Sequence, residues 1–236
     1  MLEDYFDLQL RFAKHYANAA GVPFDEAVGR CTNLRRRLNL WGAAGADRWG
    51  DFLGRLRDTV TDHSSALSVC MDLFESRPRL RQARTFGCFS YDPPDQSGAL
   101  RIHFMPAHGT SASPLAFASH AARMSELRAI FSHVRRTERS VTSVRGVSWL
   151  YNLDAYKRLF PRLYGASVQM PWFPLHMTGS STWGQVLNWR QEVEPAMRDA
   201  VLTRLAGMKV NAPWEVFPHR ALVAKCEIGH FYDWFT

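Results

Sequence analysis

An ordered series of strand and helix signals between residues 100 and 165 constrains the fold of this chain more than any other feature. Residues 100–106 alternate as a strand does, and residues 107–113 all have small or loop-forming side chains. Apolar residues then recur every three or four positions from Met124 to Val134, which predicts a helix over 114–136. A strand is predicted for residues 143–152 and a helix, broken near Pro161, for 153–165. This order predicts helices packed on a sheet.

A β-hairpin is predicted just before this stretch. Residues 85–92 are rich in aromatic side chains, and residues 92–98 contain two prolines, two aspartates and a glycine, which cannot continue a strand. Residues 100–106 then place Leu100, Ile102 and Phe104 on one face. Near the C-terminus, residues 221–228 form a final predicted strand, and the aromatic residues 229–236 are expected to pack back on the body.

The first 80 residues are predicted to be helical. Apolar residues recur at three- and four-residue steps in the segments 3–20, 24–38, 49–60 and 62–74. Gly21 ends the first helix, Pro23 begins the second, and the fourth ends before Pro78. We therefore expect an α+β fold. A helical N-terminal region, residues 1–80, precedes a mixed, mostly antiparallel sheet flanked by helices in residues 81–236, and the two can form one globular domain.

Composition narrows the classes of partner. The net charge of +7 favours polyanions or a phosphorylated cofactor, but the chain has no helix-turn-helix, RRM or zinc-finger pattern, so we do not expect nucleic-acid binding. No apolar run approaches the roughly 18 residues of a membrane helix. The N-terminus lacks the basic and apolar regions of a signal peptide, so a cytoplasmic protein is expected. The four cysteines form no CxxC pair and are read as small buried side chains.

The loop before the predicted helix is a candidate anion site. Ser113 is a favourable N-cap residue, Pro114 a favourable first helical residue, and no acidic residue follows before Glu126. Exposed amides and the positive end of the helix dipole could therefore bind a phosphate. The candidate ligand-binding residues of this loop are Gly109, Thr110, Ser111 and Ser113. An ordinary capped loop is the alternative.

Residues 149–166 resemble a passage of a known family. The run from Trp149 to Phe160, followed by Tyr164-Gly165-Ala166, is similar to the strand-then-helix passage of the Gcn5-related N-acetyltransferase (GNAT) superfamily, in which Asn precedes Ala, Leu-Tyr and Gly-Phe. The resemblance implies a GNAT-like core and transfer of an acyl group from acyl-CoA to a small-molecule or peptide amine. The family's pyrophosphate loop, Arg/Gln-x-x-Gly-x-Gly/Ala, is absent, and residues 109–113 occupy its place.

The resemblance also implies roles for single residues. Asn152 would lie beside the pantetheine arm of acyl-CoA, and Tyr156 or Tyr164 would replace the family's tyrosine as general acid. The amine proton needs a base, for which His103 and His108 are candidates because a histidine titrates near neutral pH. For both histidines a structural, hydrogen-bonded role is the alternative. No carboxylate or third histidine accompanies them at a helpful spacing, so no metal is expected.

A non-catalytic binding module is the alternative function. Such a module would bind a partner protein or an acidic ligand through a basic and aromatic surface. Five tryptophans lie in or beside irregular C-terminal segments: Trp172, Trp183, Trp189, Trp214 and Trp234. Exposed tryptophans would favour an interface, whereas buried ones would favour an enzyme core.

Overall fold

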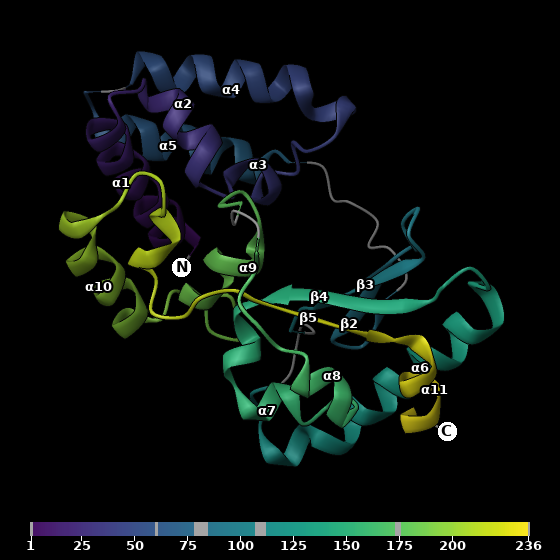
Figure 1. Cartoon of the computed structure of the whole chain (residues 1–236). Coiled ribbons are helices and arrows are strands. Elements are labelled where there is room, and N and C mark those ends of the chain that lie inside the picture. Colours follow the sequence, from purple (N-terminus) through teal and green to yellow (C-terminus); the bar gives the residue numbers. More distant parts are fainter. Residues whose placement is uncertain (1, 60, 78–84, 107–111, 173–175, 236) are drawn as a thin grey trace. The chain divides into compact units, whose positions relative to one another are not determined.

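The computed structural model describes residues 2–59, 61–77, 85–106, 112–172 and 176–235 (Figure 1). The chain forms two compact units, and each unit combines two separate stretches of sequence. The helical unit comprises Met1–Leu80 and Pro174–Arg220, and the sheet unit comprises Arg81–Phe173 and Ala221–Thr236. Each unit has a hydrophobic core of its own.

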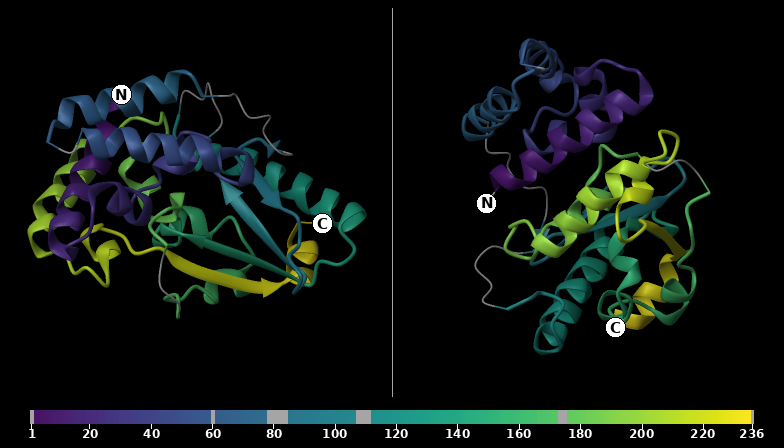
Figure 2. Two further views of the ribbon diagram at one scale, coloured as in Figure 1. Left: turned by 90° about the horizontal axis from the view of Figure 1, so that it is seen from above. Right: turned by 90° about the vertical axis from the view of Figure 1, so that its left-hand side faces the viewer.

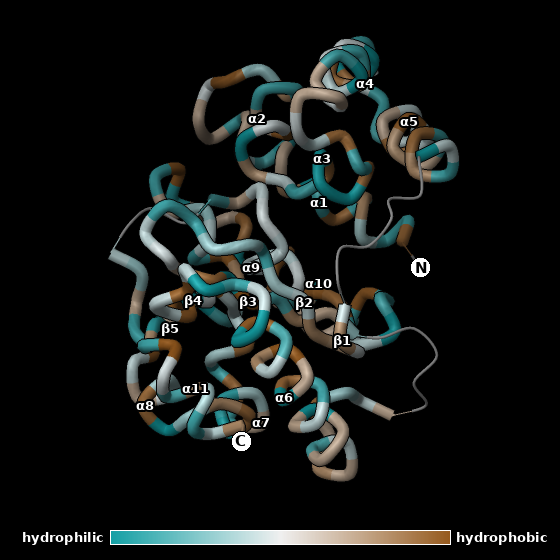
Figure 3. The backbone as a smooth tube through the Cα atoms, turned by 90° about the vertical axis from the view of Figure 1, so that its right-hand side faces the viewer, coloured by the Kyte–Doolittle hydropathy of each residue, from teal (hydrophilic) through white to brown (hydrophobic). Residues whose placement is uncertain are grey.

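The helical unit contains helices in all four of the segments predicted from the first 80 residues. Its described helices are α1 (Leu2–Ala20), α2 (Phe24–Cys31), α3 (Leu34–Arg37), η1 (Ala43–Gly45), α4 (Ala46–Asp58), α5 (His63–Glu75), α9 (Ser180–Trp183), η4 (Gly184–Val186), α10 (Pro195–Arg204), η5 (Leu205–Gly207) and η6 (Pro213–Val216). In Figure 3, apolar and polar stretches alternate along α5, as expected for a helix with one buried side.

The segment predicted as one helix over residues 24–38 is two helices, α2 and α3. The break has a local cause, because the Thr32 hydroxyl donates a hydrogen bond to the carbonyl of Val28 at 2.7 Å. The backbone N–H of Asn33 donates to the side chain of Gln9 on α1 at 2.8 Å, which satisfies an amide that a continuous helix would use. The break therefore fixes α2 to α1 through a buried polar contact.

Residues 176–220 pack with the N-terminal helices, although the sequence analysis grouped them with the sheet in residues 81–236. Trp183 of α9 is fully buried, and its indole N–H donates to the carbonyl of Cys31 at 3.0 Å. Its ring lies edge-on to Phe12 of α1 and Phe217, with centroids 5.2 and 4.8 Å apart. The core of the helical unit is therefore completed by a segment more than 140 residues away in sequence.

The sheet unit contains a five-stranded sheet in the order β1–β2–β3–β4–β5. The strands are β1 (Thr85–Phe86), β2 (Phe89–Asp92), β3 (Ala99–Phe104), β4 (Ser143–Ser148) and β5 (Leu222–Glu227). All neighbours pair antiparallel except β3 and β4, which are parallel, so the predicted mixed and mostly antiparallel sheet is confirmed. The predicted hairpin is β2–β3. The first predicted strand is shorter than expected because the chain reverses at Gly87, whose φ is +61°.

Helices cover one face of this sheet (Figure 1). They are η2 (Phe117–Ser119), α6 (His120–Thr137), η3 (Trp149–Asn152), α7 (Asp154–Lys157), α8 (Arg162–Ala166) and α11 (Ile228–Phe235). Leu127, Phe131 and Val134 of α6 are buried, as their spacing predicted. The aromatic C-terminal residues form α11, which packs on α6 with the rings of Phe131 and Phe235 stacked at 5.2 Å. The predicted break near Pro161 separates α7 from α8.

The opposite face of the sheet carries charged and polar side chains beside Ala99, Val147 and Val223, and we term it the polar face. Along each strand, residues alternate between the helix-covered face and this polar face. One row across four strands consists of Asp92, Arg101, Arg145 and Lys225, which are successive partners in the pairing register. None of the helices in the described part of the chain combines the length and the apolarity that a membrane span requires.

Candidate functional site

The most distinctive feature of the sheet unit is its one parallel pair, β3 and β4, which α6 connects. In such a strand–helix–strand unit, the carboxyl ends of both strands and the N-terminus of the helix lie at the same edge, where ligands of α/β proteins commonly bind. We term this the carboxyl edge. The strands pair at three positions only, and Arg101–Arg145 is the last of these. Beyond it β3 continues along β2 and β4 along β5, so residues 102–104 and 146–148 separate (Figure 2, left).

α6 begins at His120, so the prediction that Ser113 and Pro114 open this helix is wrong. The carbonyl of Ser113 instead accepts hydrogen bonds from the N–H of Ala116 and the hydroxyl of Ser119, both at 3.0 Å, which closes a turn. The short helix η2 then leads into α6. The first turn of α6 contains no acidic residue, as predicted, so its positive end is not neutralised by its own side chains. His108, Gly109, Thr110 and Ser111 lie outside the described residues.

Asn152 lies directly after β4, in η3, and therefore at the carboxyl edge. The predicted strand over 143–152 ends at Ser148, because the Ser148 hydroxyl accepts a hydrogen bond from the Leu150 N–H and starts the 3₁₀ turn. The exposed Asn152 side chain donates to the carbonyl of Trp149 at 2.6 Å. Its proposed contact with acyl-CoA stays a prediction.

His103 lies on the polar face near the end of β3. Its Nε2 is 2.7 Å from Oδ2 of Asp92, the neighbouring strand's residue. This contact orients the imidazole, and when Nε2 carries the hydrogen that Asp92 accepts, Nδ1 is the nitrogen able to take up a proton. A histidine held by a carboxylate is the usual arrangement of a general base and its orienting group. The same contact is also what we would expect if His103 had only a structural, hydrogen-bonded role.

Tyr156 and Tyr164 lie in the core on the helix-covered face. Both are almost fully buried, and burial raises the pKa of each phenol above its ordinary value of 10.0. The Tyr164 hydroxyl is 2.6 Å from that of Tyr151, and the ring of Tyr156 lies 5.5 Å from Phe104 at the end of β3. The structure thus brings these tyrosines together beneath the separating strands. Their role as general acids stays a prediction, and His103 lies on the other face.

Sequence reasoning missed Tyr151 and Gly146. A Cβ atom at Gly146 would overlap the hydroxyl of Tyr151 and lie 2.6 Å from that of Tyr164, so the tyrosine pair approaches β4 where only hydrogen fits. A glycine inside a predicted strand is itself a signal for the close approach of another group. That signal was present in the sequence, whereas the identity of the approaching side chains depends on the fold.

A second group that sequence reasoning missed combines exposed apolar and cationic side chains near the carboxyl edge. Phe117 of η2 has 84% of its surface exposed, and the guanidinium of Arg158 lies 5.7 Å from its ring centroid. Met105, which follows β3, is also exposed. Phe117 precedes α6 and Arg158 follows α7, so the pair is formed across 41 residues of sequence. An arginine beside an exposed aromatic ring suits a ligand with phosphate and planar groups.

The five C-terminal tryptophans divide between the two roles that the sequence left open. Trp183 is fully buried in the core of the helical unit, and Trp189 and Trp214 are partly buried. Trp172 is 89% exposed, and Trp234 of α11 is 41% exposed. The buried group is structural, and only the exposed pair in the sheet unit fits an interaction surface.

Neither a cluster of metal ligands nor a similar known protein identifies the function of this site. Among the described residues, no three histidine, cysteine or carboxylate side chains converge as a metal site would require. Comparison of the chain with protein-family models, curated proteins and solved structures finds no match. The function therefore has to be argued from the residues of the carboxyl edge.

Proposed function

We propose that the sheet unit is a GNAT-like domain that transfers an acyl group from acyl-CoA to a small-molecule or peptide amine. The observation that carries this proposal is the separation of parallel strands β3 and β4 after Arg101–Arg145. Beyond this rung, residues 102–104 of β3 and residues 146 and 148 of β4 form no ladder with each other, so backbone N–H and C=O groups border the separation. An extended ligand with amide groups, such as the pantetheine arm, can pair with such groups as an added strand does.

The charges near the carboxyl edge fit the other end of acyl-CoA. Arg158 with Phe117 offers a guanidinium and an aromatic face, and the first turn of α6 has no acidic side chain that would repel an anion. Arg101 and Arg145 form the last rung before the strands separate. These cations are consistent with a ligand that carries several phosphate charges, and with the net charge of +7.

Bound acyl-CoA supplies the activated acyl group as a thioester. In the proposed mechanism, His103 accepts at Nδ1 the proton that the amine loses as its nitrogen forms a bond to the acyl carbon. Asp92 holds the ring and stabilises the resulting imidazolium. Asn152 and the strand backbones position the ligand. The thiolate that leaves takes a proton, for which Tyr156 and Tyr164 are the candidates; both are buried, so this role requires that one hydroxyl reach the carboxyl edge.

A thermal-shift titration of the whole chain with acetyl-CoA and free CoA, at low and moderate salt, tests the proposal. A ligand that binds only the folded state raises the unfolding midpoint by mass action. We expect a saturable shift that survives moderate salt and is reduced in Arg158→Gln. The matched control is Arg162→Gln, which removes an equal charge from exposed Arg162 on α8 and should leave the shift unchanged. No saturable shift, or equal losses in the two variants, would refute binding at this edge.

The exposure of Trp172 and Trp234 favours a second candidate, an interaction module. Large exposed aromatic side chains are frequent anchors of protein interfaces. If this function is the main one, a partner retained by the unmodified protein is lost in Trp172→Ala and Trp234→Ala but retained in Arg158→Gln. Retention by every variant would exclude these tryptophans as the anchors.

A further inference from the structure

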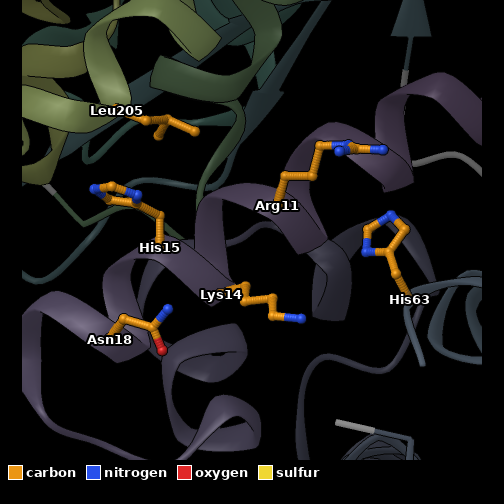
Figure 4. A pocket seen from close by; sticks show the side chains of 6 residues that line it. All are labelled: Arg11, Lys14, His15, Asn18, His63 and Leu205. Carbon is orange, nitrogen blue, oxygen red and sulfur yellow. The ribbon is translucent and has the colours of Figure 1, made fainter. Parts of the chain in front are cut away.

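A cavity in the helical unit, distant in sequence from the proposed acyltransferase residues, is lined by cationic and polar side chains (Figure 4). It has a volume of about 300 Å³ and opens to solvent. Its lining residues are Arg11, Lys14, His15, Asn18, His63 and Leu205. All belong to the helical unit, so the cavity is complete within that unit. Its volume lies at the lower end of the range of small-ligand sites.

One face of α1 supplies most of this lining. Arg11, Lys14, His15 and Asn18 are spaced at intervals of three and four residues, so they follow one another along a single side of the helix. Figure 4 shows the four side chains leaving α1, with His63 at the start of α5 on the side of Arg11 and Lys14, and Leu205 of η5 across from His15. The other face of α1 carries the buried residues of the core. The cationic face is therefore not required for packing.

Most of the polar side chains that line the cavity have donor groups without a partner in the described part of the chain. Among the described residues, the side chains of Lys14, His15 and Asn18 make no hydrogen bond or ion pair. Arg11 binds Asp7 through Nε at 2.9 and 3.0 Å, which leaves both of its Nη groups without a described partner. The donors that remain exceed what the cavity's own acceptors can satisfy.

The charge of the cavity is positive despite the adjacent Asp7. Asp7 accepts hydrogen bonds from Arg11 and from His63, whose Nε2 lies 2.7 Å from Oδ1. Burial alone would raise the pKa of Asp7, but the bonds from Arg11 and His63 outweigh it, and the pKa is lowered. Asp7 is therefore ionised and balances one cation, whereas Lys14 forms no ion pair within the described part of the chain.

We propose that this cavity binds the phosphate group of a small phosphomonoester. A phosphate dianion has three terminal oxygens and accepts several hydrogen bonds at once, which matches the Nη groups of Arg11, the ammonium of Lys14 and the amide of Asn18. A carboxylate offers two oxygens and one charge and would leave donors unused. Leu205 provides an apolar wall against which the organic part of the ligand packs.

Calorimetric titration of the full chain at constant ionic strength tests the proposal, with glycerol 3-phosphate and inorganic phosphate as probes. We expect saturable binding of glycerol 3-phosphate that is about fivefold or more tighter than that of inorganic phosphate, because only the ester contacts Leu205. Lys14→Gln should weaken it about tenfold, because one charge-assisted hydrogen bond is lost. Asn18→Ala should weaken it without any change in net charge.

Arg48→Gln is the matched control, because Arg48 is an exposed cation on α4 outside the cavity. Its affinity should equal that of the unmodified protein. Equal weakening in Lys14→Gln and Arg48→Gln would show a general charge effect and overturn the proposal, as would the absence of saturable binding. Inorganic phosphate that binds as tightly as the ester would overturn the phosphomonoester assignment. Unchanged acetyl-CoA binding in Lys14→Gln separates this site from the carboxyl edge.

Discussion

The hydroxyls of Tyr151 and Tyr164 lie 2.6 Å apart in the core of the sheet unit. Both press against Gly146 of β4, at the first position beyond the last paired rung of β3 and β4. One hydroxyl donates a hydrogen bond to the other where both side chains are buried, and an unpaired buried hydroxyl would be costly. The pair therefore supports β4 at the position where the proposed ligand-binding separation begins.

Replacing Gly146 with alanine tests the close contact between this residue and the two tyrosine hydroxyls. Gly146→Ala inserts a Cβ into the space of the Tyr151 hydroxyl, and we expect the free energy of unfolding to fall by about 2 kcal/mol, as in other overpacked cores. Urea denaturation measures the change. Adding Tyr151→Phe removes the overlapping oxygen, so the double variant should be more stable than the two separate losses predict. Strict additivity would show that the overlap is not the cause.

Because three tyrosines are buried, we expect the free energy of unfolding to decline at high pH. Burial holds the pKa of Tyr151, Tyr156 and Tyr164 above 10.0, so the folded state keeps protons that the unfolded state releases above about pH 10. The free energy of unfolding should be insensitive to these groups below pH 10 and fall above it, by up to about 1.4 kcal/mol per pH unit for each tyrosine. Urea denaturation from pH 9 to 11 measures this. Tyr156→Phe should decline less steeply, and parallel curves would contradict the assignment.

The helical unit should depend on a residue from the C-terminal half. Trp183→Ala empties a fully buried site and removes the donor to the Cys31 carbonyl, so we expect about 4 kcal/mol of destabilisation. Trp172→Ala is the matched control, because its side chain is 89% exposed, and it should change stability by less than about 0.5 kcal/mol. Both changes are measured by urea denaturation. Similar effects in the two variants would contradict the packing of residues 176–220 with the N-terminal helices.

Asp92 should act on acyl transfer through His103. In Asp92→Asn the ring loses its carboxylate partner, so we expect kcat to fall about tenfold while KM for acetyl-CoA stays the same. CoA release in the presence of an accepted amine measures both constants. Glu227→Gln, which removes a carboxylate from the same polar face of β5, should leave both unchanged. An equal fall of kcat in Glu227→Gln would show that Asp92 contributes only to the overall electrostatic potential of this face.

Local patterns were sufficient for most of the secondary structure. The helical periodicity of residues 3–20, the turn residues between Asp92 and Gly98, and the alternation of Leu100, Ile102 and Phe104 each depend on neighbours in sequence, and the structure contains the corresponding helix and hairpin. The start of α6 was predicted six residues too early, because Ser113 and Pro114 also suit the turn that Ser119 closes. Capping residues alone cannot separate these two outcomes.

Long-range contacts set the remaining features, because they depend on which surfaces meet after the chain has folded. The sequence indicated an α+β protein with a net positive charge, and the ligand contact that it predicts for Asn152 stays a prediction. It did not indicate that Trp183 fills the core between α1 and α2, that Tyr151 and Tyr164 share one hydrogen bond, or that His103 is held by Asp92 across a hairpin. Burial and partner geometry arise from packing between residues far apart in sequence, and no local spacing encodes them.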